Sequence, residues 1–429
     1  MNHMHMSALR LRFGLRGATA SSLLACVGVH ARLGRVARLS SFGGQPRNST
    51  GRNGVFTGIA IATGLGAGAY GLIYSKFWTW PQEMRSDIRD AIKARHRKDY
   101  RTSARYFQRA LDTSRRYEDP TQQLGAAYLL KISGLAIALG SVLEQIPDLG
   151  AASQVYKTAL DELPRSAPEF QEYSSQPTHA SVASDPNEIE GKLWMRAIQI
   201  GVRLAEIANR QGDEKREGEY LQRAAHKVRH LLNPKFWPNE GIENNNKLYS
   251  GLELPRWADK VEMAGVYERL GEYYNRKGIA RLALMSYGSA REILLMTPDQ
   301  FIGGRTLTSE DRCRGAMMTN NMASILATPP DGSLKEDQVL AHTLAKQALE
   351  MVEKARGNGA NPECERALVA VLYNMGLMSE IASENAEAQR YFERALAVAK
   401  TSGVKEELGG TVAEAALRRG LASRGSARE

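Results

Sequence analysis

One spacing recurs along this chain and restricts what it can fold into. A small residue is followed four positions later by an aromatic residue and three positions after that by alanine. The four copies are Ser103-Phe107-Ala110, Ala152-Tyr156-Ala159, Ala283-Tyr287-Ala290 and Ala388-Phe392-Ala395. Positions three and four apart share one face of an α-helix. Each copy therefore predicts a helix with one closely packed face.

A second signal precedes three of these copies on an earlier helical stretch: Leu139-Gly140, Leu270-Gly271 with Tyr274, and Met375-Gly376. These are positions of the tetratricopeptide repeat (TPR), in which small residues let two antiparallel helices approach and an aromatic ring fills the space between them. We expect this packing role for Phe107, Ala110, Gly140, Tyr156, Ala159, Gly271, Tyr274, Ala283, Tyr287, Ala290, Gly376, Ala388, Phe392 and Ala395.

With weaker copies included, the pattern predicts an all-α, TPR-like helical-repeat solenoid over residues 84–400. Its six helix pairs are expected at 84–113, 133–163, 193–231, 262–296, 312–354 and 367–400. Long loops at 164–188 and 233–257 stretch the repeat beyond its usual length. Residues 401–429 are expected to form a C-terminal cap and tail.

Charge is distributed unevenly between the leader and this repeat region. The first 82 residues contain nine Lys and Arg and no Asp or Glu, which leaves 48 basic and 47 acidic side chains in the rest. Residues 1–40, rich in Arg, Ser, Ala and Leu, have the composition of a mitochondrial transit peptide. Because the remaining chain is nearly neutral, it offers little attraction to phosphates, and we expect no nucleic-acid partner.

A second leader element follows a linker at 41–54. Residues 55–75 carry no charged or amide side chain, and 21 residues are enough for a helix to cross a bilayer. An aromatic membrane-exit segment follows at 76–83. We expect a single transmembrane helix, with Ala60, Gly64 and Gly68 forming a small-residue face that permits close helix contact in lipid.

The sequence contains no convincing catalytic or cofactor motif. Residues 66–71 fit GxGxxG but lack the preceding strand and the following acidic residue of a dinucleotide site. His226 and His230 lack the glutamate of HExxH and lie among basic residues. We expect no enzyme activity, cofactor, metal or small-molecule substrate. Cys313 and Cys364 lack metal-site spacing and are interpreted as unpaired thiols.

Two asparagines occupy equivalent places, in Asn321-Met322-Ala323 and Asn374-Met375-Gly376. An inward-facing Asn321 or Asn374 could hydrogen-bond the backbone of a bound peptide, or it could bridge neighbouring helices. Both remain candidates for partner binding.

One stretch resembles a narrower family. Lys76-Phe77-Trp78 and Pro81 lead into Ile88-Arg89-Asp90-Ala91 and Asp99-Tyr100, and the two asparagine-methionine helices follow later. Together they resemble the membrane-anchored TPR adaptor subunit of the fungal mitochondrial inner-membrane i-AAA protease. Thr79-Trp80 and the two long loops depart from that pattern.

The resemblance implies a non-catalytic adaptor of the inner membrane, with its C-terminal domain in the intermembrane space. Its partners would be AAA-type membrane protease subunits and unfolded or unassembled mitochondrial proteins, which it would deliver for quality control. Two alternatives remain open: a TPR assembly factor for a respiratory-chain complex, and an outer-membrane import receptor.

Overall fold

The computed structural model describes residues 79–125, 127–164, 186–232, 258–295, 307–327, 335–357, 361–402 and 418. These residues contain thirteen helices and no strand. The expectation of an all-helical chain is confirmed for this part of the protein.

Twelve of these helices form six sequential pairs. A pair consists of a first helix, a short connection and a second helix that packs against the first. The pairs are α3 (Gln82–His96) with α4 (Tyr100–Arg115), α6 (Tyr128–Gln145) with α7 (Leu149–Glu162), α10 (Pro186–Arg210) with α11 (Glu214–Leu231), α12 (Lys260–Arg276) with α13 (Ala280–Leu294), α14 (Ser309–Ala327) with α15 (Lys335–Arg356), and α16 (Pro362–Ile381) with α17 (Asn385–Thr401).

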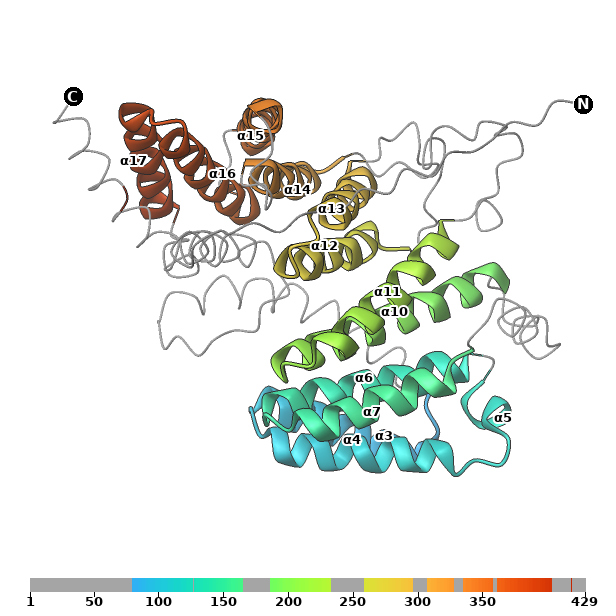
Figure 1. Ribbon diagram of the computed structural model, residues 1–429. Helices are drawn as coiled ribbons and strands as arrows, with labels where there is room; N and C mark the ends of the chain where they lie inside the picture. Colours follow the sequence, from blue (N-terminus) through green and yellow to red (C-terminus); the bar gives the residue numbers. More distant parts are fainter. Residues whose placement is uncertain are drawn as a thin grey trace, which may run out of the picture.

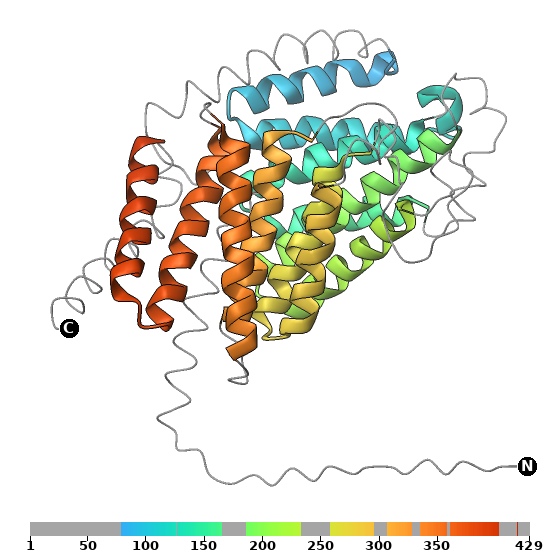
Figure 2. The same cartoon turned by 90° about the horizontal axis from the view of Figure 1, so that it is seen from above.

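The pairs stack in chain order, from α3 and α4 at one end to α16 and α17 at the other (Figure 1). Each second helix also contacts the first helix of the next pair. Seen from above, the helices of the last three pairs, coloured yellow to red, run nearly parallel (Figure 2). This stacking buries a continuous apolar core from Met84 to Ala399, as expected when no pair can bury its apolar face alone. Between α16 and α17 lies a smaller cluster of Tyr373, Leu377, Ala388 and Phe392.

Four of the connections within pairs share a backbone conformation. A residue with positive φ ends the first helix: Lys98 (62°), Gly212 (75°), Gly278 (72°) and Ser383 (64°). The next backbone N–H then donates to the carbonyl oxygen five residues earlier, as in Asp213 to Ala208 at 2.9 Å. This bond satisfies a carbonyl left without a partner at the helix end, so the pair can reverse direction within a few residues.

The helix limits differ from the expected ones by a few residues. The first helices α6 and α10 begin at Tyr128 and Pro186, earlier than the predicted 133 and 193. A short helix, α5 (Pro120–Leu124), lies between the first two pairs and was not expected. Its start is favoured by Asp119, whose side chain accepts a hydrogen bond from the backbone of Gln122, and by Pro120 at its first position.

Several expectations lie outside the described residues: the transit peptide 1–40, the linker 41–54, the span 55–75 with Ala60, Gly64 and Gly68, and most of both long loops and of the C-terminal tail. Among the residues that are described, no helix combines the length and the apolar character needed to cross a membrane.

Candidate partner-binding face

The paired helices are held together by rings that lie directly against glycine. A Cβ atom added to Gly140 would lie 2.4 Å from the Tyr156 ring, and one added to Gly376 would lie 2.5 Å from the Phe392 ring. At Gly271 the distance to the Tyr287 ring would be 2.8 Å. In each case the glycine belongs to the first helix and the ring to the second. Any larger residue would force the two helices apart.

The other residues for which a packing role is expected are also buried, with one exception. Phe107, Ala110, Ala159, Ala283, Ala290, Ala388 and Ala395 are each at most 3% exposed. Tyr274 is half-buried, and its hydroxyl oxygen accepts a hydrogen bond from the Gln222 amide on α11 at 3.1 Å. Tyr274 therefore joins neighbouring pairs at the surface and does not fill the space within one.

Consecutive first helices are connected by polar contacts. Between α10 and α12, the Gln199 amide donates to the Glu262 carboxylate at 2.7 Å, and Arg269 pairs with Glu206 at 2.6 Å. Between α12 and α14, Lys260 pairs with Asp311 at 2.6 Å, and both side chains are almost completely buried. These contacts fix the order and the register of the first helices along the stack.

One helix position repeats along this face and carries a hydrogen-bond donor in four consecutive first helices. It is the residue directly before Leu204-Ala205, Leu270-Gly271, Met322-Ala323 and Met375-Gly376. We call these four residues the donor row: Arg203 on α10, Arg269 on α12, Asn321 on α14 and Asn374 on α16. Only the two asparagines were singled out from the sequence. Arg203 was missed because its equivalence depends on the weaker repeat copy at Leu204-Ala205. Arg269 precedes the clear copy Leu270-Gly271 and was missed because its residue type differs from that of the two asparagines.

The donor row is accessible at one end and buried at the other. The side chain of Arg203 is 46% exposed and that of Arg269 is 22% exposed, whereas Asn321 and Asn374 are 4% and 1% exposed. In the described structure the amide nitrogen of Asn321 and both amide heteroatoms of Asn374 have no hydrogen-bond partner. The adjacent Asn320 is fully buried, and its amide is unpartnered as well.

The amide atoms of Asn320, Asn321 and Asn374 that lack a partner among the described residues require an explanation. A buried polar group without a partner destabilises a fold by about 1–3 kcal/mol, and such groups are rare enough that each requires an explanation. The amides of Asn320 and Asn374 make no hydrogen bond that bridges neighbouring helices within the described residues. Helix bridging by these amides is therefore not observed in this part of the chain.

Glu268 on α12 adds an unusual acid beside the donor row. Burial raises the pKa of its carboxyl to about 8, and the negative charges of Glu272 and Glu363 contribute, while Arg269 and Arg314 act in the opposite direction. The net shift favours the protonated, neutral form of the carboxyl. A protonated carboxyl can both donate and accept a hydrogen bond, which is what a peptide group requires.

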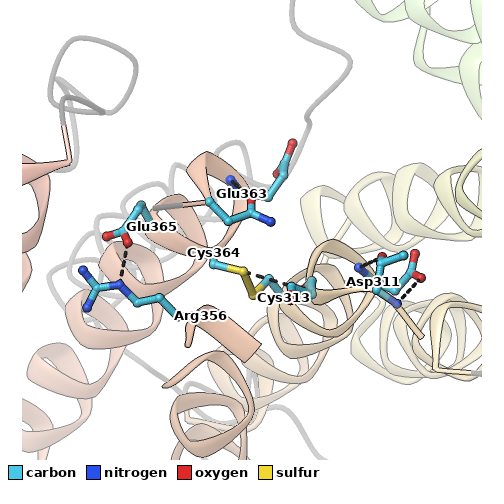
Figure 3. The surroundings of a disulfide bond; sticks show 9 residues. Asp311, Cys313, Arg356, Glu363, Cys364 and Glu365 are labelled. Atoms are coloured by element: carbon cyan, nitrogen blue, oxygen red, sulfur yellow. Dashed lines mark hydrogen bonds and ion pairs between the residues drawn. A yellow bond between two sulfur atoms is a disulfide. The ribbon is translucent and has the colours of Figure 1, made fainter. Parts of the chain in front are cut away.

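The ends of α14 and α16 are joined covalently. Cys313 and Cys364 form a disulfide with a Cα–Cα distance of 5.1 Å (Figure 3). The expectation that they are unpaired thiols is wrong. Metal-site spacing was the wrong criterion, because their separation of 51 residues is close to that between Asn321 and Asn374. Residues separated by about one repeat lie side by side on consecutive first helices.

Charged side chains surround this disulfide (Figure 3). Arg356, at the end of α15, pairs with Glu365 on α16, and Glu363 pairs with Arg366 at 2.8 Å. Arg314 on α14 lies 3.6 Å from the same Glu363 carboxylate. No group of three or more His, Cys, Asp or Glu side chains in the described ranges could hold a metal ion.

Comparison with known proteins gives no family assignment. No protein-family model matches the chain, and no curated protein matches it. Solved structures that are similar to it include two helical ones. The crystal structure of BtubC (BKLC) from P. vanneervenii is 14% identical, with 80% of this chain and 96% of that chain covered and a TM-score of 0.40. A circular tandem repeat protein with novel repeat topology and enhanced subunit contact surfaces is 11% identical, with 94% and 99% covered and a TM-score of 0.30.

Proposed function

We propose that this protein is a non-catalytic, TPR-type adaptor of the mitochondrial inner membrane. It binds unfolded or misassembled proteins and delivers them to an AAA-type membrane protease in the same membrane. The observation that carries this proposal is the donor row on four consecutive first helices, two members of which are buried amides without partners.

The chemistry of this face suits a client without folded structure. The arginine and asparagine side chains of the donor row can donate hydrogen bonds, and a protonated Glu268 carboxyl would both donate and accept them. Backbone carbonyl and amide groups are the matching partners in an extended chain. Because every sequence presents the same backbone, such a face would bind many clients weakly. Attachment to the membrane would raise its effective concentration near the protease.

The disulfide supports a position for the helical body outside reducing compartments. Disulfides persist in oxidising environments and are rare where thiols are kept reduced. Cys313 and Cys364 are both completely buried and join two helix pairs, which is typical of a structural bond. This agrees with a helical body on the intermembrane-space side of the membrane.

Affinity purification in mild detergent tests the proposal. We expect the full chain to recover AAA protease subunits together with unassembled membrane proteins. The double variant Asn321→Leu and Asn374→Leu should retain the protease and lose the clients. The matched control is Asn209→Leu, which makes the same chemical change at an exposed position at the end of α10.

The purification also separates the rival functions. Recovery of a respiratory-chain complex without an AAA protease would overturn the proposal and favour an assembly factor. Proteolysis of the helical body in intact mitochondria would instead favour an outer-membrane import receptor.

A further inference from the structure

The first described residues are firmly attached to the helical body. The Lys131 ammonium on α6 donates to the carbonyl oxygens of Thr79 and Leu124, at 2.7 Å in each case. The same ammonium lies 5.5 Å from the centre of the Trp80 ring. On α3, the Arg85 side chain donates to the Trp80 carbonyl oxygen at 2.7 Å. Thr79 and Trp80 are therefore held by two helices before α3 begins.

The chain leaves little distance between this attachment and the expected membrane span. The uncharged segment ends at Ser75, and Thr79 lies only four residues later. Four residues reach at most about 14 Å when fully extended. A bilayer is about 40–45 Å thick with a hydrocarbon core of about 30 Å, so the polar layer on each side takes up roughly half of that reach.

We propose that one end of the helical body lies against the lipid headgroups and that Lys131 fixes its orientation there. This end consists of the start of α3, the end of α4, α5 and the start of α6. The inference rests on the membrane anchoring proposed above and adds to it a defined contact between the body and the membrane.

The side chains at this end are those that a headgroup layer accepts. The exposed ones are polar and carry both charges, among them Gln82, Glu83, Arg116, Glu118 and Gln122. The half-buried ones include three aromatic residues, Trp80, Tyr117 and Tyr128. Amphipathic aromatic rings favour the boundary between water and lipid.

The proposal also predicts which helices lie far from the membrane. The pair α16 and α17 lies at the opposite end of the stack from α3, α4 and α5 (Figures 1 and 2). The donor row therefore begins nearer the bilayer at Arg203 and ends farther from it at Asn374. A client just leaving the membrane would meet the exposed arginines before the buried asparagines.

Lipid quenching of a fluorophore tests this orientation. The full chain with Cys26→Ser is reconstituted into phosphatidylcholine vesicles containing a headgroup-nitroxide lipid. A fluorophore is attached to a cysteine introduced as Gln122→Cys at the α5 end or as Ala386→Cys on α17, both exposed positions. We expect quenching to be several-fold stronger at position 122 than at position 386.

Three further variants separate attachment from orientation. Lys131→Ala should reduce the difference between the two positions, whereas Lys157→Ala, at a half-buried lysine of α7, should leave it unchanged. An insertion of about ten Gly and Ser residues between Trp78 and Thr79 should abolish the difference without lowering the thermal unfolding temperature.

Equal quenching at both positions, in a chain that resists alkaline carbonate extraction, would overturn the proposed orientation and leave the anchor intact. A difference that survives both Lys131→Ala and the insertion would overturn the role of Lys131. Release of the chain by carbonate would overturn the membrane anchor itself, and this inference with it.

Discussion

At the scale of single residues, the contact between a glycine and a ring decides how closely two helices approach. Gly271 and Gly265 lie on the same helix, α12, but only Gly271 faces a ring. A Cβ atom added at Gly265 would meet no atom within 4 Å. Alanine substitutions at these two positions therefore distinguish the cost of crowding a ring from the general preference of helices for alanine.

Gly271→Ala should lower the free energy of unfolding by about 1–3 kcal/mol, because the added methyl group collides with the Tyr287 ring. Gly265→Ala should raise it by up to about 1 kcal/mol, because alanine favours the helix and meets no neighbour. Urea unfolding followed by circular dichroism measures both values. Equal effects of the two substitutions would mean that ring contact does not limit the approach of α12 and α13.

Glu268 makes stability depend on pH in a direction opposite to that of most carboxylates. Its pKa of about 8 in the folded protein is above the ordinary value of 4.5, so the folded state retains a proton that the unfolded state releases. The stabilisation is complete below about pH 4.5 and is lost as the pH rises towards 8. The side chain of the Glu268→Gln variant is neutral at every pH, so this variant should not lose that stabilisation as the pH rises.

The unfolding temperature of Glu268→Gln should therefore exceed that of the unchanged protein at pH 8 and approach it at pH 5. Glu292→Gln, at an exposed carboxylate on α13, serves as the control and should follow the unchanged protein at both pH values. Parallel curves for Glu268→Gln and the unchanged protein would contradict the raised pKa.

At the scale of helices, the disulfide is the strongest single link between the last two pairs. It closes a loop between cysteines 51 residues apart, and a closure of this size stabilises a fold by about 4 kcal/mol through the unfolded chain. Reduction should lower the free energy of unfolding by about this amount, as measured by urea unfolding with and without reductant. Cys26→Ser should change nothing in either condition.

The disulfide can also be tested in protein purified without reductant. Unfolding in the presence of an alkylating reagent should leave Cys313 and Cys364 unmodified until a reductant is added. Alkylation of both cysteines without reductant would contradict the bond. Mass spectrometry of the peptides that contain them distinguishes the two results.

The helix pairs could be predicted from the sequence because each depends on local spacing. The ring at Tyr287 and the glycine at Gly271 lie only a short distance apart in the chain, and helical periodicity relates them. The link between Cys313 and Cys364 depends on how successive pairs are aligned, which local spacing does not express. The pKa of Glu268 likewise depends on Glu363, a residue of a helix two pairs farther along the chain.

At the scale of the whole molecule, charge separates the leader from the helical body. The residues after position 82 carry 48 basic and 47 acidic side chains. A nearly neutral body releases few counterions on contact with phosphates. The chain without residues 1–82 should therefore pass through DNA-cellulose at physiological salt. Retention that disappears as salt is raised would contradict this expectation.

Only part of the candidate site could be predicted from the sequence, because the donor row extends over four helix pairs. Asn321 and Asn374 could be recognised because their flanking residues are nearly identical. The donor row as a whole spans four helix pairs and becomes visible only when the first helices are seen side by side. A row built from a single residue of each repeat leaves little trace in any one stretch of sequence.

The oxidation state of the buried disulfide is fixed when the last two helix pairs dock. Its two sulfur atoms have no exposed surface in the folded protein, so reagents in the surroundings cannot readily make or break the bond once the last two pairs have docked. The oxidation state of a molecule therefore reports the conditions in which it folded, even after those conditions have changed. Counting oxidised and reduced molecules in one sample would show what fraction folded under oxidising conditions and what fraction folded under reducing ones.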